Sequence, residues 1–154
     1  MGIRAKFNKS VIDVALDHAV AEAHQLIIQH LAAVGEYAVN LARNHGNYKD
    51  QTGNLRASIG YVISYNGDVK LEQGFDPNAA TQTKKRRDGV TGKSEGRQLA
   101  VEIASHTSGY ALVVVAGMNY GKYVERRNYD VLTFTEAQAK EKANGLFREM
   151  FGAA

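Results

Sequence analysis

The stretch 46-GNYKDQTGNLRASIG-60 marks the point at which the sequence changes from helix-forming to strand-forming residues. Thr52 is placed to accept an otherwise unpaired backbone amide of a short helical turn over residues 53–55. Ile59, Tyr61, Ile63 and Tyr65 then recur at every second position, as do the side chains on one face of a β-strand. The stretch therefore predicts a corner between a helix and a sheet, which we call the elbow (residues 52–59).

A single long helix is predicted before the elbow. From Ser10 to about Asn44 the chain contains one glycine, Gly35, and no proline, in a run rich in good helix formers. Ser10 is the predicted N-cap, and residues 44–46 supply the polar and flexible end. Such a helix is roughly 50 Å long, more than a domain of this size needs. Part of it is therefore expected to contact another subunit.

Asn66-Gly67 predicts a β-hairpin after the elbow. A two-residue turn would place Ile63 opposite Lys70. A three-residue loop that includes Asp68 instead keeps one face of the hairpin apolar, with two pairs: Ile63 opposite Leu71, and Ile59 opposite Phe75. The longer loop is therefore predicted.

Three further elements are predicted. Residues 94–106 fit a short amphipathic helix. The unbroken apolar run Tyr110–Ala116 indicates a strand covered on both faces, near the middle of a sheet. Thr133 to Glu136 resembles a capping box that opens a last helix toward Met150. Together these elements predict one α+β domain over residues 1–154: a long N-terminal helix packed on a small antiparallel sheet of hairpin plus central strand, with a second helix and a C-terminal helix.

Composition excludes several classes of protein. The 154-residue chain has no cysteine, which excludes disulfides, thiolate zinc sites and cysteine nucleophiles. Its longest apolar run, Ala111–Ala116, is too short to cross a bilayer, so no membrane contact is expected. Residues 1–9 are not followed by the apolar stretch of a secretory signal, and we expect the chain to be made and kept in a cytosol.

No catalytic or metal-binding constellation is predicted. His18, His24 and His30 are equally spaced in the predicted helix, but six residues turn a helix by roughly 600°, so the three side chains diverge. The acidic residues near the predicted strand ends have no common spacing, and the elbow lacks the Gly-Lys-Ser/Thr ending of a phosphate loop. The sequence therefore predicts a protein that is not an enzyme and has no cofactor.

Residues 76–97 are predicted to form a long exposed loop. Between Lys84 and Arg97 the net charge of the chain, +3 overall, is concentrated in six basic and two acidic residues. A solvated loop, a contact with an acidic partner surface and a contact with DNA phosphates are all compatible with this charge. Without interleaved aromatic residues, any contact with DNA would be electrostatic. The candidate residues are Lys84, Lys85, Arg86, Arg87, Lys93 and Arg97.

Two motifs in this order make the chain resemble a known family: Tyr48-x-x-Gln51-Thr52-Gly53-Asn54-Leu55-Arg56-x-Ser58-Ile59 and Tyr120-Gly-x-Tyr123-Val124-Glu125. The chain is similar over residues 10–150 to the tail-completion or head-to-tail joining (neck) proteins of long-tailed double-stranded DNA bacteriophages. Those proteins usually carry an acid where Gln51 stands, and continue with Phe-Gly-Thr-Gly after the second motif. The matching positions here are Thr52, Gly53, Leu55, Arg56, Ser58, Tyr120, Tyr123, Val124 and Glu125.

The resemblance implies a structural virion protein of the phage neck or tail, assembled in the host bacterial cytoplasm. It would form part of a homo-oligomeric ring around the DNA channel. Its partners would be copies of itself and neighbouring adaptor, portal-proximal or tail proteins, with non-specific DNA contact in the channel. The alternative from the residues is a small basic DNA-binding protein that uses residues 84–97 as a phosphate clamp. A metal-dependent hydrolase would require Asp and Glu residues to converge in the fold.

Overall fold

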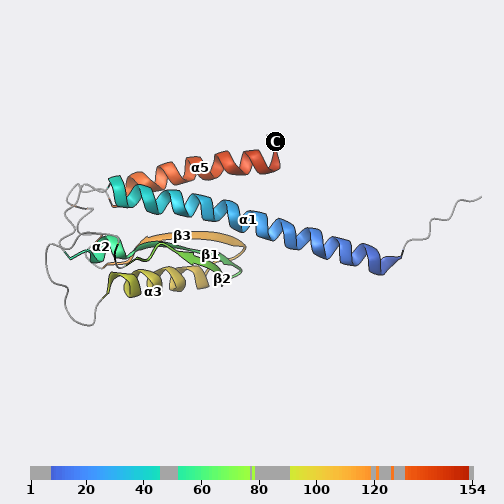
Figure 1. The fold of residues 1–154 in the computed structure, drawn as a ribbon, viewed down its shortest axis with the longest axis horizontal. Helices are drawn as coiled ribbons and strands as arrows, with labels where there is room; N and C mark the ends of the chain where they lie inside the picture. The colour runs from blue at the N-terminus through green and yellow to red at the C-terminus, as the bar shows by residue number, and fades with distance from the viewer. Residues whose placement is uncertain are drawn as a thin grey trace, which may run out of the picture.

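The computed structural model describes residues 8–45, 52–76, 78, 91–118, 121, 126 and 131–152. These residues form three layers (Figure 1), with helices α1 and α5 on one side of a three-stranded antiparallel sheet and helix α3 on the other. The predicted α+β class is confirmed. The elements are α1 (Lys9–His45), α2 (Asn54–Ala57), β1 (Ile59–Tyr65), β2 (Asp68–Gln73), α3 (Gly92–Ser105), β3 (Tyr110–Ala116) and α5 (Thr133–Phe151).

Helix α1 has 37 residues and is therefore about 55 Å long. The predicted helix is confirmed, but Ser10 is not its N-cap. Asn8 precedes the helix, and its side-chain Oδ1 accepts hydrogen bonds from the backbone N–H of Ser10 (3.3 Å) and from its hydroxyl (2.8 Å). Buried residues occur only in the C-terminal half of α1: Leu31, Val34, Gly35, Ala38, Val39 and Ala42.

The strand order is β2-β1-β3, so the middle strand is β1. The prediction that Tyr110–Ala116 is the central strand is wrong, because β3 lies at an edge. Helices cover both faces of the sheet, and a strand in such a sheet needs apolar side chains on both faces wherever it lies. The helices on both faces of the sheet therefore explain the apolar run of β3. The run does not indicate a central position in the strand order.

The hairpin between β1 and β2 combines a tight turn with a β-bulge. Tyr65 pairs directly with Asp68, so the loop is the two-residue Asn66-Gly67 turn, in which both residues have positive φ. The predicted three-residue loop is wrong. Ile63 nevertheless pairs with Leu71 as predicted, because the register shifts between Ile63 and Ser64 and leaves Lys70 as the extra residue of the bulge.

The predicted pairing of Ile59 with Phe75 is also wrong. The ladder between β1 and β2 ends at Tyr61 opposite Gln73, and the chain then turns at Gly74, where φ is 97°. Phe75 consequently packs with Val62 on the α3 side of the sheet, whereas Ile59 lies on the α1 side.

Side chains of β1 alternate between two apolar clusters. Ile59, Tyr61 and Ile63 pack against α1, together with Leu31, Val39 and Ala42. Val62 points to the opposite face of the sheet. There it packs with Phe75, with Val115 of β3, and with Ala100 and Ala104 of α3. The alternation predicted for residues 59–65 is thus confirmed, and both faces of β1 are buried.

Two helix boundaries differ from prediction. Helix α3 begins at Gly92, with Thr91 as N-cap, whose side-chain oxygen accepts the backbone N–H of Ser94 at 3.3 Å. Residues 91–97 therefore do not belong to an exposed loop, contrary to the prediction for 76–97. Helix α5 begins at Thr133 with Leu132 in the N-cap position, and the backbone N–H of Glu136 donates to the carbonyl of Leu132 at 2.8 Å. Thr133 is therefore the first residue of the helix and not the N-cap that the predicted capping box requires.

Helix α5 runs antiparallel to α1 and covers only part of it (Figure 1). The ring of Phe134 lies 5.7 Å from that of His45, and further along Lys142 lies 5.1 Å from the ring centre of Tyr37. With 19 residues, α5 is about half as long as α1. The N-terminal part of α1 therefore extends past both α5 and the sheet.

We predict that Gly35→Ala destabilises the protein. A Cβ at this position would lie 2.6 Å from the buried ring of Tyr61. Alanine favours a helix over glycine by up to about 1 kcal/mol, but the steric overlap should outweigh this and give a net loss of about 1–3 kcal/mol. Urea unfolding measures the change. Gly145→Ala in α5, with nothing within 4 Å, is the control and should not destabilise. Equal stability of Gly35→Ala and the parent would contradict the packing.

A second prediction concerns alkaline pH. The Tyr61 hydroxyl donates a hydrogen bond to Glu36 Oε1 at 3.1 Å, and burial, with the Glu36 charge adding to it, raises the pKa of Tyr61. A raised pKa in the folded state leaves stability unchanged below the unfolded value of about 10 and lowers it above that pH. Unfolding free energies measured between pH 8 and 11 should fall less steeply for Tyr61→Phe. Identical slopes would show that Tyr61 ionises normally.

Candidate interaction surfaces

The elbow is a single helical turn closed by its own side chains. The Thr52 hydroxyl oxygen accepts the backbone N–H of Asn54 at 3.4 Å, and Gly53 has a left-handed φ of 73°. The Ser58 hydroxyl donates to the carbonyl of Leu55 at 2.7 Å. The predicted turn is present but begins at Asn54 rather than Gly53, because the chain reverses at the glycine.

Other segments of the described chain pack closely on the elbow. Leu55 is buried with Val131, and the carbonyl of Ser58 accepts the backbone N–H of Gly117 at 3.3 Å. Gly96 of α3 lies against Ser58, where a Cβ would be 2.2 Å from the carbonyl oxygen. Any side chain at position 96 would push α3 away. The elbow is therefore a structural joint onto which α3 packs, backbone to backbone.

Arg43 ties the long helix to the sheet. Its Nη2 donates hydrogen bonds to the carbonyl of Ile59, at 3.0 Å, and to that of Gly74. These carbonyls belong to the start of β1 and to the segment that follows β2. Sequence reasoning missed Arg43, because a basic residue in the last turn of a helix is commonly solvated and favourable there for its charge alone.

The structure places only part of the predicted motif residues. Arg56 lies half-buried in α2, beside Leu55. Tyr120, Tyr123, Val124 and Glu125 lie outside the described residues. Gly121, between them, is buried, and its backbone N–H donates to the carbonyl of Met118 at 2.8 Å. Met118 packs against the cluster of Leu55 and Val131. Gly121 of the second motif is thus next to Leu55 of the elbow.

The predicted basic loop is only partly covered by the described residues. Lys84, Lys85, Arg86 and Arg87 lie outside them. Lys93 and Arg97 lie on α3 instead of a loop. Arg97 Nε donates to Glu72 Oε1 of β2 at 2.8 Å, so this guanidinium already has a carboxylate partner within the domain.

The three equally spaced histidines of α1 have partners within the domain. His18 lies 3.5 Å from Glu22, and His24 forms a hydrogen bond with the hydroxyl of Tyr110. His30 Nδ1 lies 2.8 Å from the carbonyl of Leu26. Within the described part of the chain there is no group of three or more His, Asp or Glu residues that could hold a metal ion.

The N-terminal part of α1 forms an exposed arm, Lys9–Ala23, in which every residue is exposed. It projects beyond the rest of the described domain (Figure 1). Five large aliphatic side chains on the arm are about half or more exposed, although such residues are usually buried: Val11, Ile12, Val14, Leu16 and Val20. Contiguous exposed apolar surface often marks an interaction site, so the arm is a candidate interaction surface.

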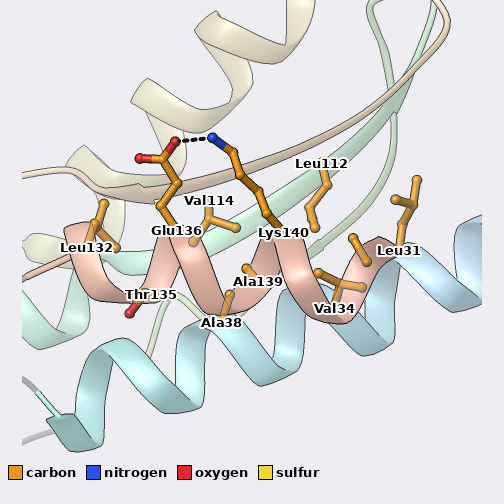
Figure 2. Close-up of a pocket in the computed structure, with 11 residues that line it drawn as sticks. Leu31, Val34, Ala38, Leu112, Val114, Leu132, Thr135, Glu136, Ala139 and Lys140 are labelled. Atoms are coloured by element: carbon orange, nitrogen blue, oxygen red, sulfur yellow. Dashed lines mark hydrogen bonds and ion pairs between the residues drawn. The ribbon is translucent and has the colours of Figure 1, made fainter. Parts of the chain in front are cut away.

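A second apolar surface is a groove between α1, α5 and β3, with a volume of about 360 Å³. Figure 2 shows Leu112 and Val114 of β3 on one side of it, with the α1 and α5 side chains around the rest. The ion pair between Lys140 and Glu136, at 2.6 Å, lies on its rim. The groove is lined by Leu31, Val34, Ala38, Leu112, Val114, Leu132, Thr135, Glu136, Ala139, Lys140 and Ala143.

Comparisons with protein-family models, with curated proteins and with solved structures gave no match to this chain. None of the described helices is both long enough and apolar enough to cross a membrane. The arm and the groove both present apolar side chains at the surface of the described domain.

We predict that Arg43→Met destabilises the fold by about 2–4 kcal/mol, because two backbone carbonyls lose a charged donor. Methionine keeps much of the side-chain length, so the loss of packing is small. Arg148→Met, at an exposed position of α5, is the matched control and should change stability by no more than about 0.5 kcal/mol. Chemical denaturation compares the two, and equal effects would show that Arg43 does not tie α1 to the sheet.

Proposed function

We propose that this protein is a structural component of the phage neck that works by assembling with copies of itself into a ring around the DNA channel. The observation that carries the proposal is the arm: fifteen consecutive exposed helical residues, Lys9–Ala23, with large aliphatic side chains. Exposed aliphatic surface is removed from water when a partner covers it. The resemblance of the two sequence motifs to neck proteins supports the choice of partner.

The mechanism is geometric rather than chemical. Each domain supplies one rigid wedge, in which the elbow and Arg43 fix α1 relative to the sheet. Contacts between unlike surfaces of successive copies form a ring when the rotation from one copy to the next closes. The closed ring then presents one repeated surface to the adaptor or portal-proximal proteins and another to the tail.

The DNA-binding alternative has less support than the ring. Of its six candidate residues, the two within the described chain lie on α3, and Arg97 is engaged with Glu72. Non-specific phosphate contact by Lys84 to Arg87 remains compatible with a ring that surrounds DNA.

Labelling this chain in intact particles tests the proposed function. We expect the label at the junction of head and tail, and we expect particles made without the chain to accumulate as separate heads and tails. Complementation with the parent protein should restore joined particles, and Leu16→Asp should restore fewer, because a charge would replace an aliphatic contact of the arm. Absence of the chain from purified virions, or normal infectivity without it, would refute the proposal.

A further inference from the structure

We propose that the arm of one copy docks into the groove of the next copy, so that each molecule provides the arm for one neighbour and the groove for another. This inference rests on the proposed function in that it takes copies of this chain as the partner. It goes further by assigning the two surfaces that meet and by making the contact head-to-tail.

The arm carries a ridge of the right shape for a groove between helices. Ile12, Leu16 and Val20 are spaced four residues apart, and side chains at this spacing form one continuous row along a helix. Their exposed fractions are 50%, 62% and 48%. Ridges of this kind pack into grooves between the side-chain rows of other helices.

The groove is chemically suited to receive aliphatic side chains. Its lining is mostly Leu, Val and Ala from three elements, and the charged pair lies at the rim rather than the floor. Its volume of about 360 Å³ is accessible to water. Replacing water on such a lining by aliphatic side chains is favourable.

The arm cannot reach the groove of its own molecule. Leu16 and Leu31 lie on the same helix, separated by fifteen residues, or about 22 Å along its axis. Leu31 lines the groove, whereas the arm points away from it (Figure 1). A continuous helix cannot fold back over this distance, so only another molecule can bring an arm to the groove.

Charge favours the groove over a second arm as the binding surface. The arm contains one lysine, two aspartates and one glutamate, a net charge of −2. Two arms side by side would therefore place like charges together. Helix α5, which forms one wall of the groove, has three basic and three acidic residues and is neutral.

The area that one arm can bury favours repeated contacts. Half of the surface of a fifteen-residue helix is roughly 350 Å², so one docked arm removes roughly 700 Å² from water on both molecules together. Stable interfaces generally exceed about 1,000 Å². A copy in a closed ring makes this contact twice, once with its arm and once with its groove. The geometry therefore points to weak pairwise association and a ring stabilised by closure.

Disulfide trapping between two variants tests the proposed contact, since the chain has no cysteine of its own. One variant carries Leu16→Cys in the arm, and the other carries Ala139→Cys in the groove. After oxidation, a mixture of the full-length variants should give about tenfold or more of the mixed disulfide dimer than of either homodimer, because docking raises the effective concentration of the two thiols. Ala143→Cys provides a second groove position if Ala139→Cys impairs folding.

Val14→Cys mixed with Ala139→Cys is the matched control. Val14 is as exposed as Leu16 but lies about 160° around the helix from it, so it should give little mixed dimer. Equal trapping by Val14→Cys would show random collision. Predominant homodimers of Leu16→Cys would show pairing between two arms. Either outcome, or the absence of mixed dimer at any protein concentration, overturns the inference.

The trapping result is separable from the test of function. If the disulfide forms between arm and groove but virions lack this chain, the contact is real and the proposed function is wrong. If labelling places the chain at the neck and no arm-to-groove disulfide forms, the function stands and the assignment of surfaces is wrong.

Discussion

Burial of β1 on both faces is the constraint on which the rest of the structure depends. Ile59, Tyr61 and Ile63 require an apolar layer on one side, and Val62 requires another on the opposite side. A strand of this kind needs a packing layer on each face, and here both layers are helical. Helix α1 supplies the first and α3 the second, and Arg43 satisfies carbonyl groups where the sheet meets α1.

The same constraint explains why surfaces remain for partners. Only the C-terminal half of α1 is needed to cover β1, and α5 packs along that half. The arm consequently extends beyond any element of its own domain. Helix α5 packs on α1, on the same side of the sheet, and leaves a groove between these two helices and β3.

The elbow shows how packing alone can constrain a sequence motif. Thr52 and Ser58 accept or donate hydrogen bonds within the turn itself, and Leu55 anchors a small apolar cluster. Gly96 of α3 lies against the carbonyl of Ser58, and the backbone N–H of Gly117 after β3 donates to the same carbonyl. The constraint on these residues is therefore the fit of three chain segments at one point, which is sufficient to fix the order of turn, apolar and small residues.

Local sequence alone determined the long helix, the strand alternation of residues 59–65, the hairpin and the α+β class, because each depends on periodicity or on a turn residue such as Gly67. It also determined that the long helix would exceed its own core. Tertiary structure decided the position of β3 at an edge, the bulge at Lys70, the reversal at Gly74 and the partners of Arg43 and Arg97. The groove likewise exists only once α1, α5 and β3 are assembled. Strand order, register shifts and surfaces shared by distant segments depend on which elements pack together, and no local pattern of residues contains that information.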